Sequence, residues 1–321
     1  MIRKVILAVG IYCCYFQIAM AADSHREFYD YVLELQQQAL NAGVTQLTVE
    51  RNIPKIKIYK KANVKNVDSQ QTLDTYIPQA VPEITVSTAR ALFQQHSVKL
   101  QQFSQRYGVQ SRFLVALWGI ESSFGEKKGD FPALSVLASL AYKGSNESFY
   151  IQEFIAALKL IDQYQLTFEQ LLSTSTGAMG QMKMMPSQLL KYAIDADHDG
   201  SVDVWTSIDD AFASAANMLS LQGWKSDTTW GRQVKSTIML DPQLIGLTSK
   251  YTFSQWHAYG IRRFNGDDLP ERDDMQVSLI APDGVKGRYY LVYDNFILLN
   301  QFSSTLRNTL AVTYLSEKIK Q

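Results

Sequence analysis

Both cysteines of this 321-residue chain, Cys13 and Cys14, lie in an apolar stretch that runs from Val5 to Met20 behind two basic residues. Such a stretch, ending in Ala19-Met20-Ala21, is typical of a secretory signal peptide over residues 1–21. We expect cleavage before Ala22, which leaves a mature chain without cysteine. Its fold must therefore be held by a packed core and not by disulfide bonds.

An uncleaved membrane anchor is the alternative interpretation of this N-terminus. The apolar stretch is somewhat short for that role, because a spanning helix needs about 20 apolar residues. Lipidation of a cysteine is disfavoured, since Tyr12 and Cys13 are poor matches to the small residue that precedes a lipidated cysteine. No later segment of the sequence is long and apolar enough to span a bilayer. We therefore expect an exported chain with no membrane span after cleavage.

The composition indicates a globular protein that does not bind nucleic acid. Hydrophobic residues make up 46% of the chain and charged residues 19%, which is ample for a buried core and excludes general disorder. The 31 basic and 31 acidic side chains cancel, so the basic excess that displaces counterions from phosphates is missing. The length allows one large domain or two small ones.

The spacing of apolar residues predicts helices in the first half of the chain. One is expected over Arg26–Ala42 and a long one over Thr88–Tyr107. Between them, residues 52–65 carry several lysines around apolar side chains. A strip that binds a polyanion is one interpretation of this segment, but a solvated, partly extended segment is favoured.

The segment Ser111–Phe124 is the first that indicates chemistry. Leu114, Leu117 and Trp118 share a helix face with Glu121, just before the helix reaches a glycine. Loss of hydration on such a face raises the pKa of a carboxyl group, as a general acid near neutral pH requires. A glutamate at a helix end that extends to water fits the spacing equally well, so the pattern alone leaves both interpretations open.

Residues 174–187 combine two glycines, Gly177 and Gly180, with hydroxyl side chains and methionines. Glycine allows the backbone to approach a ligand closely, and methionine can line an adaptable apolar surface. Core packing is the commoner explanation of a methionine cluster. The Walker spacing is absent, so the segment is not a phosphate loop.

Residues 195–203 reproduce the first half of a calcium-binding loop, with carboxylates at positions one, three and five, glycine at six and an apolar residue at eight. Thr206 stands at position twelve, where a bidentate glutamate is usual, so a later aspartate would have to close the site. An aspartate-rich turn held by bonds from side chain to backbone is the alternative. We expect a structural Ca²⁺ ion and no organic cofactor. The predicted ligands are Asp195, Asp197, Asp199, Ser201 and one of Asp209 and Asp210.

Together these motifs resemble the B-type family of lytic murein transglycosylases, bacterial cell-wall enzymes with a lysozyme-like core. The resemblance extends from about Phe28 to Leu315, nearly the whole mature chain. Several ordered matches are more specific than any one of them. They are residues 107–109 and 116–125, residues 177–180 and 185–187, the aspartate loop through Trp205, residues 214–217 and 223–224, Asn295-Phe296, and Ala311-Val312.

The resemblance implies cleavage of the β-1,4 bond between N-acetylmuramic acid and N-acetylglucosamine without water, which gives a 1,6-anhydromuramoyl product. In this family one carboxyl group protonates the glycosidic oxygen and then accepts the proton of the muramoyl C6 hydroxyl; here that group would be Glu121. No second carboxylate is needed if the acetamido group of the substrate stabilises the cationic centre. Glu126, Asp130 and Glu153 lie nearby along the chain, but none has a comparably apolar context.

The implied partners are peptidoglycan glycan strands in the periplasm, together with an envelope protein complex as a further expectation. The chain departs from the family pattern where the glycan would bind: Lys183 replaces a glutamine, Met218 a tyrosine and Ser303 an asparagine. Thr174 keeps the hydroxyl of a family serine that could orient Glu121. The predicted substrate-binding residues are Thr174, Gly180, Lys183, Met185, Met218 and Ser303.

Three functions are compatible with these residues. An active but divergent transglycosylase is favoured, because a glutamate on an apolar helix face is costly to retain without use. In that case Lys183 is expected to contact a carboxylate of the substrate. A peptidoglycan-binding or scaffold protein that kept the fold and lost turnover is the second. A calcium-stabilised periplasmic binding protein for other ligands is the third.

The expected fold is mainly α, within the α+β class. An N-terminal helical region is predicted at residues 22–87, a lysozyme-like core with the calcium loop at 88–225, a small β-rich subdomain at 226–293, and a final segment at 294–321 whose helix returns to the core. The β-rich prediction depends on two short apolar runs, Val277–Ile280 and Tyr289–Val292, which are separated by the turn signal Pro282-Asp283-Gly284.

Overall fold

The structure is a computed structural model that describes residues 27–60, 62, 71–142, 144–303 and 305–320. The predicted signal peptide, its cleavage site and the alternative membrane anchor lie outside these residues. Export to the periplasm therefore stays a prediction from the sequence. Within the described ranges, no helix combines the length and the apolarity that crossing a membrane would take.

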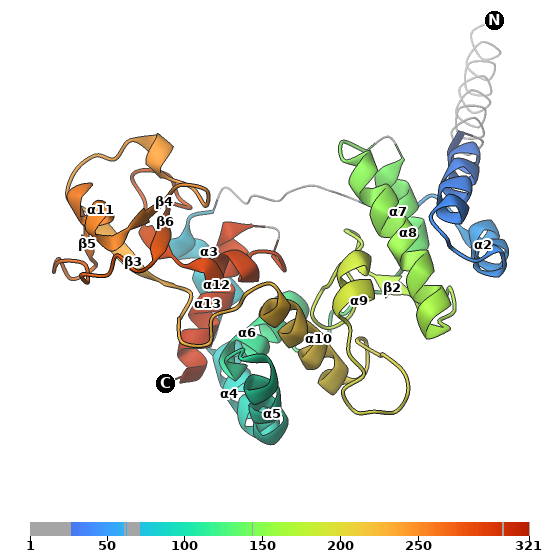
Figure 1. Cartoon of the computed structure of the whole chain (residues 1–321), viewed down its shortest axis with the longest axis horizontal. Helices are drawn as coiled ribbons and strands as arrows, with labels where there is room; N and C mark the ends of the chain where they lie inside the picture. Colours follow the sequence, from blue (N-terminus) through green and yellow to red (C-terminus); the bar gives the residue numbers. More distant parts are fainter. Residues whose placement is uncertain (1–26, 61, 63–70, 143, 304, 321) are drawn as a thin grey trace, which may run out of the picture. The chain divides into compact units, whose positions relative to one another are not determined.

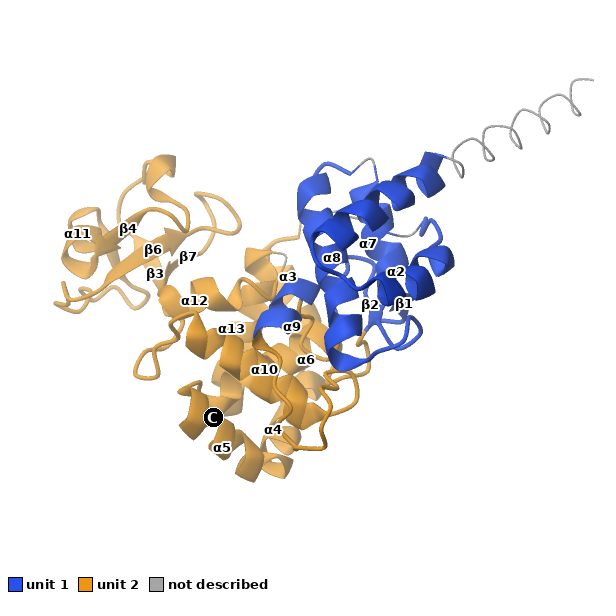
Figure 2. Cartoon of the chain, turned by 45° about the vertical axis from the view of Figure 1, so that its right-hand side comes forward, with its two compact units in different colours: residues 1–64, 129–179, 185–191 blue, residues 65–128, 180–184, 192–321 orange. Residues whose placement is uncertain are grey.

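Contacts along the chain define two compact units, each assembled from separate stretches of sequence (Figure 2). Unit 1 takes residues 1–64, 129–179 and 185–191, and unit 2 takes residues 65–128, 180–184 and 192–321. Residues 88–225, which are predicted from the sequence to form one core, are thus divided between the two units. The boundaries expected at residues 87 and 225 do not coincide with this division.

Unit 1 is mainly helical. After a helix whose described part spans residues 27–41, its elements are α2 (Gln46–Asn52), η1 (Ile53–Lys55), α7 (Ala133–Ala141), α8 (Glu147–Tyr164) and α9 (Pro186–Tyr192, whose last residue is grouped with unit 2). Two short antiparallel strands, β1 (Phe131–Pro132) and β2 (Leu172–Ser173), complete it. Helix α7 packs along α8 and is buried on nearly every side. Its almost wholly apolar sequence is what such burial requires.

The helical part of unit 2 consists of α3 (Leu73–Ala80), α4 (Glu83–Gln95), α5 (Ser97–Tyr107), α6 (Ser111–Ser122), α10 (Ile208–Leu221), α12 (Asp294–Leu299) and α13 (Leu306–Lys320) (Figure 1). Helix α6 packs against α13, α4 and α5. The single long helix predicted over Thr88–Tyr107 is wrong. The chain breaks at His96, whose ring packs edge-on against Trp118 and Phe212, a tertiary contact that local periodicity does not register.

The rest of unit 2 is the predicted β-rich subdomain. Its five strands are β3 (Gly231–Ser236), β4 (Lys250–Thr252), β5 (Ile261–Arg263), β6 (Gln276–Ile280) and β7 (Tyr289–Val292), in the antiparallel order β4-β6-β7-β3-β5. The two runs identified in the sequence are β6 and β7, and Leu279 lies opposite Leu291. Helix α11 (Phe253–Ala258) adds Trp256, which is fully buried and donates to the carbonyl of Val277 at 2.9 Å. η2 (Pro242–Leu244) lies between β3 and β4.

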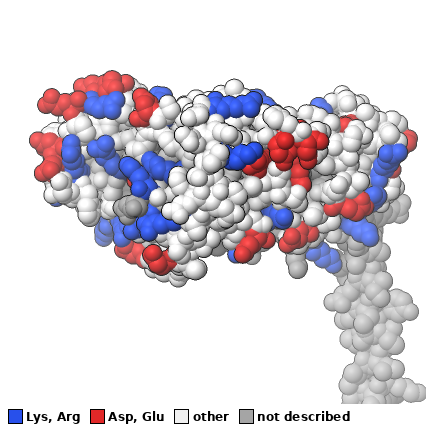
Figure 3. All heavy atoms as spheres, turned by 90° about the horizontal axis from the view of Figure 1, so that it is seen from below, with Lys and Arg blue, Asp and Glu red and all other residues white. Residues whose placement is uncertain are grey.

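The fold class is confirmed as mainly helical with a small β-rich insertion. Strands β3, β4 and β5 were not anticipated, because they are short and carry charged side chains at several positions. On the face drawn in Figure 3, basic and acidic side chains both occur and neither sign covers the surface. This distribution agrees with the equal numbers of the two kinds in the sequence.

Candidate functional site

Glu121 lies in the last turn of α6 in unit 2. On the same helix face Leu114 and Leu117 are fully buried and Trp118 is nearly so, as the apolar spacing predicts. Glu121 itself is mostly buried. The interpretation in which the carboxylate extends freely into water is therefore wrong, because the group is drawn into the same interior as its apolar neighbours.

Three successive residues with positive φ follow Ser122, the last residue of α6 and the neighbour of Glu121. Ser123, Phe124 and Gly125 have φ values of 51°, 57° and 86°. The backbone N–H of Phe124 donates to the carbonyl of Trp118 at 3.1 Å, and the hydroxyl of Ser122 accepts from the N–H of Gly125 at 2.9 Å. Two non-glycine residues in this region cost on the order of 1 kcal/mol each, a strain that persists where the surrounding structure fixes the turn.

The indole of Trp118, one turn before Glu121 on α6, contacts side chains of other segments. Its Nε1 donates to Oε1 of Gln181 at 2.9 Å, and its ring meets those of Phe212, Phe124 and His96 edge-on, with centroids 5.3, 5.5 and 5.9 Å apart. Edge-to-face pairs of this kind stabilise a fixed arrangement of rings. The last turn of α6, and Glu121 with it, is therefore anchored through Trp118.

Gly119 allows α6 to be covered closely by its own end and by α13. A Cβ at this position would lie 2.7 Å from the ring of Phe124 and 3.1 Å from the side chain of Leu315. No side chain fits in that space without displacing one of the two. Glycine at position 119 thus permits the packing of α13 beside Glu121.

Two side chains near the start of α13 hold the Glu121 carboxylate. Ser303 Oγ donates to Oε1 at 2.7 Å, and Asn308 Nδ2 donates to the same oxygen at 2.9 Å. Tyr76 in α3 donates from its hydroxyl to Asn308 Oδ1 at 3.1 Å, which directs the amide nitrogen toward Glu121. Burial, followed by the charge of Glu121, raises the pKa of Tyr76, so the phenol stays a neutral donor.

Burial raises the pKa of Glu121 from its ordinary value of 4.5 to about 7. The bond from Ser303, the charge of Lys183 and the bond from Asn308 act in the opposite direction and limit the rise. A carboxyl group with this pKa exists in both protonation states near neutral pH. It can therefore donate a proton in one step and accept one in the next.

The segment of residues 180–184 belongs to the same unit as Glu121. Lys183 is buried, adopts φ 53°, and donates from Nζ to the carbonyl of Lys127. Its ammonium therefore has a partner inside the protein, and its charge favours the ionised form of Glu121. Gly180 (φ 70°) is needed for packing, since a Cβ there would lie 2.8 Å from the carbonyl oxygen of Val204.

The other predicted substrate-binding residues divide differently. Ser303 lies against Glu121, as described above. Met218 in α10 is fully buried and contributes to packing. Thr174 and Met185 belong to unit 1, where the Thr174 hydroxyl bonds with that of Thr176 at 2.9 Å. A role of Thr174 or Met185 toward a ligand stays a prediction.

One expectation about the neighbouring carboxylates is wrong. Glu153 does occupy an apolar context, because only 3% of it is exposed, in the middle of α8. Its two oxygens accept from the backbone N–H and the hydroxyl of Ser187, at 2.9 and 2.6 Å. Two charge-assisted bonds satisfy this carboxylate and fix the start of α9, which is a structural role.

The aspartate loop brings three carboxylates together in unit 2. Oxygens of Asp195, Asp197 and Asp210 all lie within 4.8 Å of one another. Asp210, which is 1% exposed, accepts from the backbone N–H of Ala196 and of Asp203 at 2.8 Å each, so it closes the loop from α10. Carboxylate oxygens are the kind of ligand that Ca²⁺ prefers, and these three would supply part of the six to eight oxygens that the ion takes.

The remaining predicted ligands lie outside this three-carboxylate cluster in the described part of the chain. Asp199 Oδ1 accepts from the backbone and hydroxyl of Ser201 at 2.8 Å each. Asp209 pairs with Lys99 at 2.8 Å, so Asp210 and not Asp209 completes the cluster. Asp195 also accepts from the backbone N–H of His198 at 2.7 Å. The bonds of an aspartate-rich turn are thus present together with the convergence of carboxylates.

The raised pKa of Glu121 predicts a pH-dependent effect of Glu121→Gln on stability. Between the ordinary value of 4.5 and about 7 the folded state holds a proton that the unfolded state has lost, so the wild type loses stability as the pH rises through 7. The variant lacks this loss. Its unfolding free energy relative to wild type should therefore rise from pH 4.5 to pH 8, by at most roughly 3 kcal/mol. Urea unfolding at both pH values measures this, and a difference that does not change with pH would contradict the raised pKa.

Three comparisons with known proteins agree with one another. The model of a family described as transglycosylase SLT domain matches residues 27–317. The membrane-bound lytic murein transglycosylase B of Escherichia coli (strain K12) is 28% identical over 240 residues, which are 73% of this chain and 63% of that protein. The chain thus matches less than two thirds of the length of that curated relative.

Among solved structures, SltB3 from Pseudomonas aeruginosa in complex with NAG-anhNAM-pentapeptide superposes with a TM-score of 0.80 at 31% identity, over 91% of this chain and 79% of that one. The lytic transglycosylase Slt35 of Escherichia coli in complex with calcium gives a TM-score of 0.76 at 21% identity, over 90% of this chain and 92% of that one. At 21% identity, the similarity to Slt35 concerns the fold alone.

Proposed function

Because the chain belongs to the transglycosylase SLT domain family, we propose that it is a lytic transglycosylase that cleaves peptidoglycan with Glu121 as its single general acid and base. The observation that carries the proposal is the state of this carboxyl group: it is mostly buried, held on one oxygen, and has a pKa of about 7. The relative SltB3 was solved with a fragment named as containing anhNAM. That product class is the one proposed here.

The two hydrogen bonds to Glu121 assign different tasks to its oxygens. Both Ser303 and Asn308 donate to Oε1, and among the described residues no donor contacts Oε2. In the neutral acid, Oε1 is then the carbonyl oxygen and Oε2 carries the proton. Oε2 is therefore the atom we assign to proton transfer.

The reaction follows from this assignment. The proton on Oε2 passes to the glycosidic oxygen while the bond from that oxygen to C1 of the muramoyl residue breaks, and N-acetylglucosamine leaves as an alcohol. The carbonyl oxygen of the acetamido group can stabilise the cation at C1. Oε2 then accepts the proton of the C6 hydroxyl as its oxygen bonds to C1. Glu121 returns to the neutral acid, no water is consumed, and the product is a 1,6-anhydro sugar.

Unit 2 contains a cavity of about 460 Å³ that is lined by residues adjoining Glu121 in the sequence, Ile120 and Ser123 among them, but not by Glu121 itself. Asn308, which bonds to Glu121, is part of its wall, together with Tyr76, Thr88 and Lys127. Its polar wall suits the hydroxyl and amide groups of a sugar. We assign this cavity to part of the glycan strand.

The same proposal includes a structural Ca²⁺ ion held by Asp195, Asp197 and Asp210. The ion would offset the repulsion of three close carboxylates and fix the loop to the start of α10. It has no part in the proton transfers.

A scaffold or peptidoglycan-binding protein without turnover is the second candidate. Two observations favour it: Met218 is an apolar, fully buried side chain, and the ammonium of Lys183 already has a partner inside the protein, so neither offers a polar group to the expected glycan surface. The absence of polar contacts from positions 183 and 218 would weaken glycan binding more directly than it would change the proton transfers at Glu121.

A digest of purified peptidoglycan sacculi with the mature protein tests the proposal, with the products identified by mass. Muropeptides with anhydro ends are the expected result. Products with reducing ends would mean hydrolysis and would overturn the ring closure. Binding to sacculi with no soluble product would favour the scaffold. Retention of binding should be measured in the same samples by sedimentation.

A further inference from the structure

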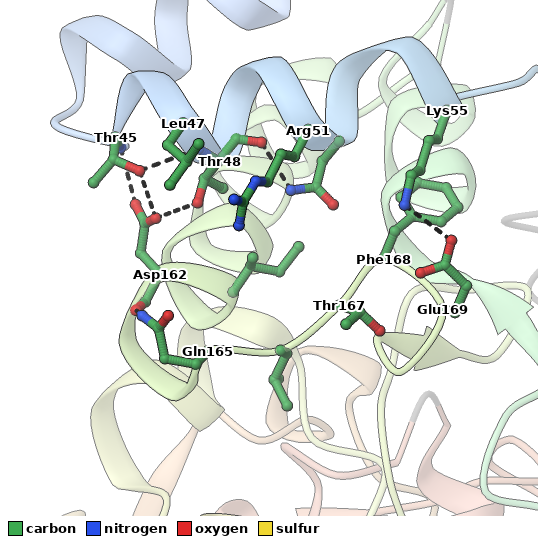
Figure 4. Close-up of a pocket in the computed structure, with 13 residues that line it drawn as sticks. Thr45, Leu47, Thr48, Arg51, Lys55, Asp162, Gln165, Thr167, Phe168 and Glu169 are labelled. Carbon is green, nitrogen blue, oxygen red and sulfur yellow. Dashed lines mark hydrogen bonds and ion pairs between the residues drawn. The ribbon is translucent and has the colours of Figure 1, made fainter.

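Unit 1 contains a second cavity, of about 420 Å³, between α2, η1 and the turn that follows α8 (Figure 4). Its lining residues all belong to unit 1, whereas Glu121 and the residues that hold it belong to unit 2. The proposed reaction therefore gives this cavity no task. Its size is within the range of cavities that bind small ligands.

One wall of the cavity is held by a partly exposed hydrogen-bond cluster. Asp162, near the end of α8, accepts from the backbone N–H and hydroxyl of Thr45 at 2.9 and 2.7 Å, and from the hydroxyl of Thr48. Burial opposes the ionisation of Asp162, but these bonds outweigh it and lower its pKa. The carboxylate is thus charged and fully engaged. These donors tie the start of α2 to the end of α8, and the charges of Asp162 and Glu169 in the lining are balanced by those of Arg51 and Lys55.

Two cationic side chains extend into the cavity from α2 and η1 (Figure 4). Lys55 is paired with Glu169 at 3.0 Å and lies over the ring of Phe168. Arg51, one turn earlier, has no ion pair or hydrogen bond with any residue that the structure describes. A guanidinium offers two parallel donors that match a carboxylate, so Arg51 is the free anion-binding group of this cavity.

The rest of the lining is mixed. Leu47, Leu166 and Phe168 supply apolar surface, and Leu47 is 53% exposed. Gln165 and Thr167 add neutral polar groups to the lining. A neutral sugar would leave the guanidinium of Arg51 without a charged partner. A carboxylate with a small apolar group beside it uses both kinds of surface.

We propose that this cavity binds a short peptide with a free carboxylate, through Arg51, with small apolar side chains against Leu47 and Leu166. Under the proposed function, on which this identification of the ligand rests, the peptide is the stem of peptidoglycan, which ends in alanine with a free carboxylate. Binding a stem at a second site raises the effective concentration of the same polymer at the catalytic unit.

The first test is direct binding of a small probe to the full mature chain. Calorimetric or NMR titration should detect N-acetyl-D-alanyl-D-alanine, and binding should fall about tenfold or more when the carboxylate of the probe is amidated or Arg51 is replaced in Arg51→Gln. Lys57→Gln is the matched control, because it removes an exposed charge from the same segment outside the cavity. Equal binding of acid and amide, equal binding by Arg51→Gln, or no binding at all would overturn the proposal.

The second test separates this proposal from the proposed function. Rates are compared on intact sacculi and on glycan strands from which an amidase has removed the stems. The rate on sacculi divided by the rate on stem-free strands should fall in Arg51→Gln, because the KM for sacculi rises. The same ratio should be unchanged in Lys57→Gln. If sacculi are cleaved and the ratio is the same in all three proteins, the proposed binding of the stem peptide is wrong, whereas the proposed transglycosylase activity is supported. If the wild type cleaves neither substrate, the proposed transglycosylase activity is wrong. The titration with the small probe still tests whether the cavity binds a carboxylate.

Discussion

Glu121→Gln should lower the rate at which anhydro-ended muropeptides appear from sacculi by about 10³-fold or more, because one residue supplies both the acid and the base. Glutamine keeps the shape of the side chain, and its amide oxygen can still accept from Ser303 and Asn308. It has no proton to give to the glycosidic oxygen and no charge to receive one from the C6 hydroxyl. The change therefore isolates the proton transfers from the packing of α6.

The matched control is Glu83→Gln, an exposed glutamate in the first turn of α4 within the same unit. Its rate should stay within about twofold of wild type, since exposed substitutions seldom disturb the fold. Both variants should bind sacculi as wild type does. If Glu121→Gln retains a tenth of the wild-type rate, another group performs the chemistry and the assignment of Glu121 is wrong.

Removal of calcium should produce the second large effect, a lower melting temperature. An ion at one hundred times its dissociation constant stabilises the folded state by about 2.7 kcal/mol, which for a chain of this size corresponds to a fall of roughly 4 °C on chelation. Thermal denaturation with excess calcium and with a chelator measures the difference. No shift at any calcium concentration would leave the loop as an aspartate-rich turn without an ion.

Two neighbouring aspartates provide a pair of variants for this experiment. Asp210→Asn should abolish the calcium-dependent shift, because Asp210 closes the three-carboxylate cluster. Asp209→Asn should keep it, because Asp209 is paired with Lys99 outside the cluster. The comparison is of the shift between calcium and chelator in each protein, so a general loss of stability in one variant does not affect it. Equal shifts in the two variants would contradict the ligand assignment.

Local sequence patterns predict well those parts of the molecule whose structure is determined by a short run of consecutive residues. The face of α6 shows four positions with helical spacing, and β6 and β7 are short apolar runs on either side of a clear turn. The aspartate loop is a specific signal because a calcium loop requires oxygen ligands and a glycine at fixed positions. Each of these signals lies within a dozen or so consecutive residues.

The groups that complete the site leave no such signal. Asn308 bonds to Glu121, Tyr76 bonds to Asn308, and Gln181 bonds to Trp118. The three come from distant segments, and each is an ordinary polar residue in its local sequence. Asn308 does stand in the first turn of a helix with a largely buried face, and that position was the one available clue. The burial of Glu153 was missed for a similar reason, since its partner Ser187 is 34 residues away.

The interleaving of the two units sets an order for biosynthesis. Unit 1 takes its last stretch from residues 185–191, and unit 2 takes residues from 65 up to the end of the chain. Neither unit corresponds to a continuous fragment, so neither can be completed while the ribosome is still making the first half of the protein. The helices at residues 27–55 must wait for residues 129–191 before their unit can close. A truncation that keeps one unit whole must therefore also carry stretches of the other: residues 1–191 contain all of unit 1 together with residues 65–128 of unit 2.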